Sequence, residues 1–319
     1  MLVASVRAGD EQAFVRLTAP HRSTLHAHCY RLLGSVCDAD DALQETLLRA
    51  WRGMDRFEPR APLAAWLHRI ATNVCLRMLE QRSRTVAVVD AHLEPYPDRL
   101  VDELPSHERS PHAVVEEREA IGLAFVAAMQ LLPPKQRAVL VLRDVLDWSA
   151  RDVADALGES QAAVNSALQR SRERMRRERA QPTLARIHRP ADARAEGAAM
   201  RKFQEAWEAV DIDGILELLA DDALLTMPPE GVRIAGARPI AGFFATQPLQ
   251  GRLDRIRLVP ARANGQPALA AYADEQGEGR FDAYGVMVFA IEGDRIAGIT
   301  GFPNRPDLFT RLGLPVEAR

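Results

Sequence analysis

Apolar residues recur at helical spacing over the first 82 residues of the chain and again between residues 113 and 179. Repeats at i and i+4 place apolar side chains on one face of a helix, so both stretches predict packed α-helices. Pro59 and Pro62 interrupt the first stretch. Its periodic positions form three runs: Ala13, Leu17, His21, Leu25 and Cys29; then Leu43, Leu47, Ala50 and Trp51; and, after the prolines, Trp66, Ile70, Val74 and Met78.

The last part of the chain has a different pattern. Two helical stretches, 196–210 and 212–222, precede runs of apolar and β-branched residues that predict strands. A helical pair followed by antiparallel strands indicates an α+β domain. Glu292-Gly293-Asp294 is typical of a hairpin turn. The expected strands are residues 223–227, 252–263, 268–273, 281–291 and 295–302.

Two proline-containing stretches without a sustained period separate these patterns, and we interpret both as linkers. The expected fold class is multidomain, with two all-α domains followed by one α+β domain. A length of 319 residues suits this division, because single cores rarely exceed about 250–300 residues. The linkers are residues 83–112 and 182–195, and the predicted domains are residues 1–82, 113–181 and 196–316.

The net charge of −3 conceals an uneven distribution along the chain. Residues 1–85 and 131–181 each carry +3, whereas 86–130 carries −6 and 196–319 carries −5. Two mildly basic blocks that flank an acidic connector indicate a modular chain rather than a single enzyme core.

The cysteines and the apolar runs restrict where the chain works. No apolar run approaches the roughly 20 residues of a membrane span, and the N-terminus has no secretion-signal pattern. Three cysteines without a CxxC pair argue against a disulfide framework and favour a reducing cytoplasm. His26, His28, Cys29 and Cys37 match no standard zinc spacing, so we expect no metal and no cofactor.

Residues 149–175 have the spacing of a helix-turn-helix. Ser149 and Ser160 can cap two successive helices, and Ala154 is small where those helices would approach each other. Gly158 suits a turn that needs a positive φ, and Val164 can fix the second helix onto the first. The second helix of such a unit lies in the major groove of DNA, with polar residues at base edges and arginines at phosphates. The alternative is a solvated helical face with internal ion pairs.

A second cluster of polar residues lies in the segment Asp38–Trp66, where acidic side chains share one exposed helical face and apolar ones the opposite face. Composition alone favours a solvated surface, although such a face can also dock a basic partner. This segment, together with residues 67–79, closely resembles region 2 of bacterial sigma factors, and residues 132–176 resemble region 4. A chain with only these two regions is similar to the extracytoplasmic-function group.

The resemblance implies roles for individual residues. The helix matching the one that docks the clamp of core RNA polymerase, through its β and β′ subunits, contains Asp40, Asp41, Gln44, Glu45, Thr46 and Arg49. The loop and helix matching the −10 DNA-binding surface contain Arg56, Arg60, Trp66, Arg69, Asn73 and Arg77. Flipping a base out of the stack requires a shaped pocket, which this loop would supply. For Trp66, packing in the core is an equally strong interpretation. The helix matching the −35 reader contains Ser160, Gln161, Ala163, Asn165, Ser166, Gln169, Arg170, Arg172 and Arg174.

Residues 196–316 resemble the SnoaL-like branch of the NTF2-like fold, a cone that often holds a small-molecule pocket. Sigma factors of the SigG- and SigJ-like group carry such a domain, with short proline motifs similar to residues 94–98 and 304–308. We therefore expect a regulatory contact involving Tyr96 and Asp98 in the linker and Asn304 and Asp307 near the C-terminus. Binding of a small-molecule ligand in the cone is the alternative interpretation of this domain.

The C-terminal domain contains no histidine and no cysteine, so acid–base catalysis would depend on carboxylates and tyrosines. Asp282 is the best candidate; strand alternation would place it on one face with Tyr284, Val286 and Val288, but a solvent-facing position is the stronger interpretation. The expected function is promoter recognition with core RNA polymerase, without catalysis and without a membrane. The alternatives are a one-component DNA-binding regulator with a sensing domain, or an NTF2-like enzyme fused to a DNA-binding arm.

Overall fold

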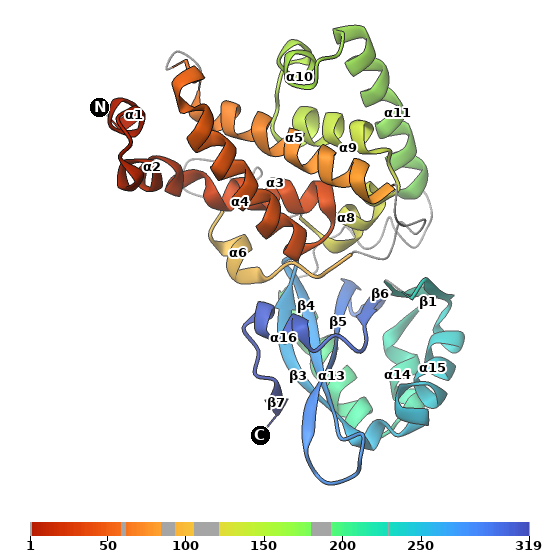
Figure 1. Cartoon of the computed structure of the whole chain (residues 1–319). Coiled ribbons are helices and arrows are strands. Elements are labelled where there is room, and N and C mark those ends of the chain that lie inside the picture. The colour runs from red at the N-terminus through yellow and green to blue at the C-terminus, as the bar shows by residue number, and fades with distance from the viewer. Residues whose placement is uncertain are drawn as a thin grey trace. The chain divides into compact units, whose positions relative to one another are not determined.

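The computed structural model describes residues 2–58, 62–83, 93–104, 121–179, 193–228 and 230–318 (Figure 1). It divides into two compact units. The first contains residues 1–89, 100–121 and 126–176, and the second contains residues 90–99, 122–125 and 177–319. Two short segments that precede residue 126 therefore belong with the C-terminal domain. The predicted boundary at residues 112 and 113, and most of the predicted linker 182–195, lie outside the described residues.

The N-terminal part of the first unit is a helical bundle. Asp10 caps α2 and Ser35 caps α4 through side-chain bonds to backbone N–H groups. The single helical period expected between Ala13 and Cys29 is wrong, because the chain breaks at the 3₁₀ turn η1 (Ala19–His21), which contains Pro20. The helices are α1 (Leu2–Arg7), α2 (Glu11–Thr18), α3 (Arg22–Leu33), α4 (Val36–Gly53) and α5 (Leu63–Ser83), with a 3₁₀ turn η2 (Met54–Arg56).

Three histidines are buried in this bundle, and two of them, His28 and His68, contact each other. His28 Nε2 is 2.9 Å from the Thr72 hydroxyl, and the rings of His28 and His68 meet edge to face with centroids 5.1 Å apart. Burial lowers the pKa of both, and the His68 pKa falls to about 4. Both rings are therefore neutral in the folded protein near pH 7. The described residues hold no cluster of ligands suited to a metal ion.

The second half of the first unit contains the expected helix-turn-helix. Ser149 and Ser160 accept hydrogen bonds from the N–H groups of Asp152 and Ala163, as the capping pattern predicted. Gly158 has a φ of 67°, which a residue with a Cβ adopts at a cost. The elements are α9 (Pro134–Leu140), the π turn η4 (Val141–Val145), α10 (Ala150–Leu157) and α11 (Gln161–Arg179). Two further helices, α6 (Asp98–Asp102) and α8 (Leu123–Gln130), begin in segments of the second unit and end in the first.

A buried arginine joins the two halves of the first unit. The Arg137 guanidinium on α9 donates to the Leu32 carbonyl at the end of α3 and to the carbonyls of Gln130 and Leu132 at 3.0 and 3.2 Å. Burial lowers the Arg137 pKa to about 10. The carbonyl oxygens satisfy a cation that is otherwise costly to bury, so α9 is fixed against α3.

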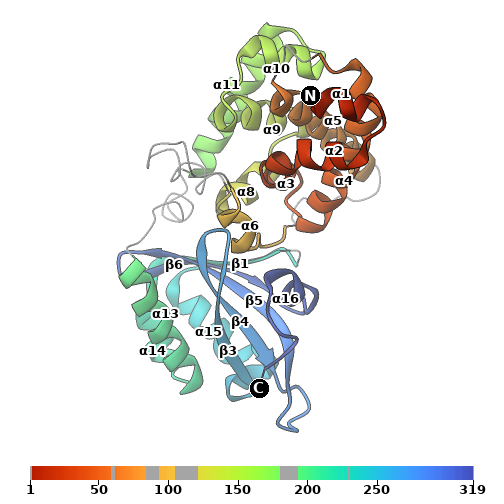
Figure 2. The ribbon, with the colours of Figure 1, turned by 90° about the vertical axis from the view of Figure 1, so that its left-hand side faces the viewer.

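The second unit is a curved, mixed sheet with helices on its concave face (Figure 2). The strand order is β2-β1-β6-β5-β4-β3, and β7 pairs with β5. The strands are β1 (Leu219–Met227), β2 (Val232–Ala235), β3 (Ile256–Ala263), β4 (Gln266–Ala273), β5 (Phe281–Glu292), β6 (Arg295–Phe302) and β7 (Glu317–Ala318). The helices are α13 (Ala193–Glu208), α14 (Ile212–Leu218), α15 (Ala237–Thr246) and α16 (Asp307–Leu312), with 3₁₀ turns η5 (Pro248–Gly251) and η6 (Leu253–Arg255).

An aromatic core lies between the helices and the concave face of this sheet. Phe203 contacts Trp207, Phe244 and Phe289 with ring centroids 5.1–6.1 Å apart. The Trp207 indole N–H donates to the Ile256 carbonyl at 3.2 Å, which satisfies the polar atom of a buried ring. On the opposite face, Tyr272 packs against Phe309 of α16. Neither face of the sheet is therefore a bare surface.

The second unit differs from the sequence expectation in several respects. Strands β2 and β7 were not predicted, and the strand expected from residue 252 begins at Ile256, after the turn η6. The predicted helix 212–222 ends at Leu218, and β1 begins at the next residue. β1 runs parallel to β6, although antiparallel pairing was expected throughout. Helix α15 follows the short strand β2 and was missed, because Pro239 and Gly242 weaken its helical pattern. None of the described helices is long and apolar enough to cross a bilayer.

Candidate nucleic-acid interface and linker-binding site

Four of the six residues expected at −10 DNA line one open groove of about 630 Å³ in the first unit. Its wall combines cationic side chains with Trp66 and Asn73, and Glu80 is the one acidic residue among the described residues that line it. The Trp66 ring is half-buried and lies 5.1 Å from the Phe57 ring. Trp66 therefore both packs on the protein and lines the groove. The cationic lining residues are Arg49, Arg56, Arg77 and Lys135.

One of the expected −10 residues lies away from this groove, and another falls outside the described residues. Arg69 is exposed on α5 and does not line this groove, and Arg60 lies outside the described residues. Leu157 and Lys135, which come from the second half of the unit, were missed as lining residues. No local signal could have identified them, because their place depends on the packing of α9 and α10 against α5.

The expected polymerase-docking residues divide by exposure along α4. Asp40, Asp41 and Gln44 are exposed, and Glu45 pairs with Arg49 at 2.6 Å. Thr46 is fully buried, and its hydroxyl donates to the Ala42 carbonyl at 2.6 Å. The Thr46 side chain thus supports the helix rather than presenting itself to a partner.

One residue of this face was missed by the sequence analysis. Leu48 is 42% exposed, which is unusual for a large apolar side chain in a folded domain. It lies seven residues after Asp41 and four after Gln44, so the three share one side of α4. The α4 face thus combines acidic residues with an exposed apolar side chain. Leu48 was missed because apolar residues recur regularly along this helix, so the sequence pattern does not show which of them is exposed.

Helix α11, the second helix of the helix-turn-helix, presents nearly all of its expected contact residues to solvent. The exposed residues are Gln161, Asn165, Ser166, Gln169, Arg170, Arg172 and Arg174, with Ser160 at the cap and Ala163 half-buried. The opposite side is buried through Val164, Leu168, Ser171 and Met175, as the period predicted. Arg172 is held by the Asp144 carboxylate through two bonds of 3.0 and 2.7 Å, and Arg170 donates to the Ser166 hydroxyl at 2.6 Å.

Within the second unit, the linker residue Tyr96 is bound by the turn between β3 and β4. The Tyr96 N–H donates to the Asn264 side-chain oxygen at 2.8 Å, and the Asn264 N–H donates back to the Tyr96 carbonyl at 2.7 Å. Pro97 forms an antiparallel bridge with Ala263. Tyr96 is 0% exposed. The linker segment therefore adds to the end of the β3–β4 hairpin.

Asp98 is bound by the same turn. Its carboxylate accepts from the Gly265 N–H at 2.7 Å and from Arg262 at 3.0 Å. The Leu123 N–H donates to the Gln266 side chain at 3.2 Å. Residues 262–266, which we call the linker-binding turn, thus contact the chain both before and after the segment 99–122. The Asn-Gly pair of this turn was a hairpin signal that the sequence analysis did not use.

A buried ion cluster holds the start of the linker segment. The Glu94 carboxylate accepts from Arg305 at 2.8 Å and from Arg311 at 3.0 Å, and its side chain is 9% exposed. Arg305 also bonds Asp307 at 2.8 Å. These bonds raise the pKa of Arg305 and lower the pKa of Asp307. Asp307 also lies 4.0 Å from Arg311, so it is connected to Glu94 through both arginines.

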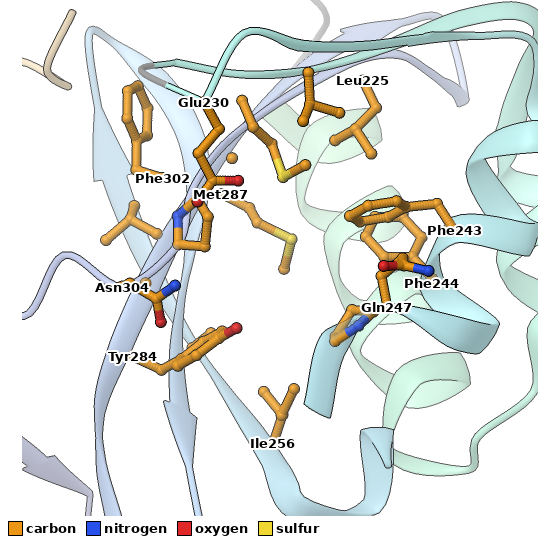
Figure 3. A pocket seen from close by; sticks show the side chains of 18 of the residues that line it. Leu225, Glu230, Phe243, Phe244, Gln247, Ile256, Tyr284, Met287, Phe302 and Asn304 are labelled. Carbon is orange, nitrogen blue, oxygen red and sulfur yellow. The ribbon is translucent and has the colours of Figure 1, made fainter. Parts of the chain in front are cut away.

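Asn304 occupies a different place, at a pocket of about 280 Å³ on the concave side of the sheet (Figure 3). Asp282 does not line this pocket; it is partly exposed and pairs with Arg280 at 2.8 Å. Asp282 and Tyr284 line a smaller pocket together, as expected for residues on one face, but the expected alternation does not continue to Val286 and Val288, because β5 shifts register against β4 between Gly285 and Ala283. Tyr284 is the extra residue of this bulge, and its ring also lines the larger pocket on the concave side.

Family models match three segments of the chain. Residues 17–85 match Sigma-70 region 2, residues 122–175 match Sigma-70 region 4, and residues 200–299 match the SnoaL-like domain. The ECF RNA polymerase sigma factor SigG of Mycobacterium tuberculosis is 40% identical over 98% of this chain and 86% of its own length. SigJ of the same organism is 30% identical over 69% of this chain and 67% of its own length.

A solved structure has the same overall architecture. The crystal structure of the Mycobacterium tuberculosis extracytoplasmic function sigma factor SigJ matches with a TM-score of 0.65 at 24% identity, and the match covers 94% of this chain and 99% of that one. At this identity the match shows the fold, namely helical sigma domains followed by a sheet-rich NTF2-like domain.

Proposed function

Because the chain belongs to the extracytoplasmic-function sigma factors, we propose that it directs core RNA polymerase to promoters and that its C-terminal domain controls this activity in cis. The control would act through the linker that joins the two sigma regions. The observation that carries this proposal is the binding of that linker by residues 262–266, before and after the segment 99–122. A transcription factor of this family has no need for a catalytic site.

The α4 face is the proposed docking surface for core polymerase. Its exposed carboxylates at Asp40 and Asp41 suit a basic partner, and the exposed Leu48 adds apolar area to the same face. Charge complementarity of this kind mainly sets the rate and the specificity of association. The ion pair between Glu45 and Arg49 lies beside this surface and orders its edge.

Promoter DNA is the proposed partner of the groove and of α11. Cationic side chains around the groove can neutralise the backbone of a melted strand, while Trp66 offers a ring for stacking. On α11, Gln161 and Asn165 lie in the first turns, where base edges are read. Arg170 and Arg174 lie further along the helix and suit phosphates, which carry affinity rather than sequence choice.

The linker-binding turn restricts how far the two sigma regions can separate. The −10 and −35 elements are separate sites on promoter DNA, so a sigma factor that binds both must span the distance between them. The 24 residues between Asp98 and Leu123 could span about 80 Å when fully extended. When one turn binds both Asp98 and Leu123, the two ends of that segment lie close together and the linker cannot extend. The C-terminal domain would therefore oppose simultaneous binding of both elements.

The test is run-off transcription with the full chain and core polymerase on one promoter. Asp98→Ala and Arg262→Ala each remove the ion pair that holds the linker, so both should raise transcript yield two- to tenfold. Arg252→Ala is the matched control, because Arg252 is as exposed as Arg262 and also pairs with an aspartate, Asp254, in the same domain. Unchanged yield from both linker variants would refute control through this contact. We also propose that the pocket on the concave face takes a small molecule.

A further inference from the structure

We propose that the pocket of the C-terminal domain binds a neutral, largely apolar ring compound, and that its occupancy is coupled to the hold on the linker through residues 303–305. This inference rests on the proposed function only in taking the linker as the controlled element. The pocket lies entirely within the second unit, so its geometry follows from that unit alone.

The lining sets the shape and polarity of the compound. Trp207, Phe243, Phe244 and Met287 form a continuous apolar wall from α13, α15 and β5. A volume of about 280 Å³ suits a compound of two or three rings rather than a single small ion. Aromatic side chains prefer stacked or edge-to-face contacts with flat rings. The pocket is therefore suited to a flat, mainly apolar compound.

The charge of the lining excludes anions. Among the described residues that line the pocket there is no lysine, arginine or histidine, and the one charged residue is the acidic Glu230. An anionic group in this pocket would lose its hydration without gaining a cation, which is costly. A neutral compound avoids this cost.

Three neutral polar side chains can orient such a compound. The Tyr284 ring extends across the pocket in Figure 3, and Gln247 and Asn304 lie at its edge. Burial raises the pKa of Tyr284, so its hydroxyl keeps the proton and can donate a hydrogen bond. These groups match a hydroxyl or carbonyl on the compound.

The loop after β6 connects the pocket to the linker within two residues. Asn304 lines the pocket with a φ of 55°, in the left-handed region. The next N–H, that of Arg305, donates to the Tyr284 carbonyl at 3.0 Å, while the Arg305 guanidinium bonds the linker residue Glu94 at 2.8 Å. A compound that moves Asn304 or Tyr284 must therefore act on the residue that holds Glu94. Coupling of this kind is reciprocal: if occupancy alters the hold on Glu94, loss of that hold alters affinity by the same factor.

The first experiment tests the site on the full chain by fluorescence titration with N-phenyl-1-naphthylamine. The matched probe is 8-anilinonaphthalene-1-sulfonate, which adds one sulfonate to the same ring skeleton. The neutral probe should bind at least about tenfold more tightly. Val232→Trp, on the half-buried edge strand β2, should fill the pocket and weaken binding at least tenfold, whereas Val316→Trp on the exposed C-terminal segment should not. Equal affinity for both probes, or equal loss in both variants, would overturn the site.

The second experiment tests the coupling. Glu94→Gln removes the charge that Arg305 and Arg311 hold, and it should change the Kd of the neutral probe at least about fivefold. Asn304→Gly removes one pocket contact and tolerates the positive φ, so Glu94→Gln should have a smaller effect on Kd in that background, where only the bond from Arg305 to the Tyr284 carbonyl remains. An unchanged Kd in Glu94→Gln alone would overturn the coupling. Neither titration contains polymerase, so a failure here is distinct from a failure of the transcription experiment.

Discussion

At the scale of single residues, the first unit buries groups that water would otherwise hydrate. His28 and His68 are neutral in the fold because burial and the nearby Arg31 disfavour their charged forms. Thr72 satisfies one ring nitrogen of His28. The bundle thus depends on the protonation state of two histidines.

The lowered histidine pKa values make the free energy of unfolding depend on pH. The unfolded histidines take up protons as the pH falls below about 6.5, whereas the folded His68 does so only near its pKa of about 4. The unfolded state therefore binds more protons in that window, and the free energy of unfolding falls as the pH drops from 6.5 towards 4. The slope for each histidine is about 1.4 kcal/mol per pH unit.

Urea unfolding at pH 7.5, 6.5 and 5.5 measures this loss. His68→Gln should reduce the decline in the free energy of unfolding between pH 6.5 and 5.5 by about 1 kcal/mol. The same pH dependence in the variant and the parent chain would show that His68 does not titrate in this window.

At the scale of elements, the resemblance to sigma factors predicts that the face of α4 docks core polymerase. The structure adds the exposed Leu48 to this face. Asp41→Arg should weaken binding to core polymerase at least tenfold, because the new cation would meet a basic partner. The fold should persist, since Asp41 is exposed. Co-purification with core polymerase measures the effect, and Glu205→Arg on the exposed face of α13 is the control. Equal recovery of both variants would contradict the docking role of α4.

Local elements were largely predictable from the sequence, and distant pairings were not. The caps at Ser149 and Ser160 and the turn at Gly158 depend on neighbours within a few residues, so their chemistry is visible in the sequence. The partner of Tyr96 is Asn264, 168 residues away, and no periodicity links the two. Similarly, the bulge at Tyr284 changes which residues face the pocket, because one extra residue reverses the alternation of a strand.

At the scale of the whole molecule, the C-terminal domain holds the linker at two places, the linker-binding turn and the pair Arg305 and Arg311. Truncation can separate the effects of these two contacts. A chain ending at residue 195 loses the linker-binding turn, whereas a chain ending at residue 303 keeps it but loses Arg305 and Arg311. We expect the shorter chain to show the greater rise in run-off transcript yield, with the chain ending at residue 303 between it and the full chain. Circular dichroism of both truncated chains provides the control for folding. Equal yields at matched concentration from all three chains would contradict regulation in cis.

The ion pair between Asp98 and Arg262 joins two parts of one polypeptide, and this has a consequence for gene dosage. A separate inhibitor must be made in proportion to its target, and overproduction of either protein upsets the balance. Here both partners are translated together at a fixed ratio of one to one, and their effective concentration is set by the connecting chain. The fraction of molecules with a bound linker is therefore independent of expression level. Raising the copy number of the gene would raise the amount of active protein in proportion, without saturating the control.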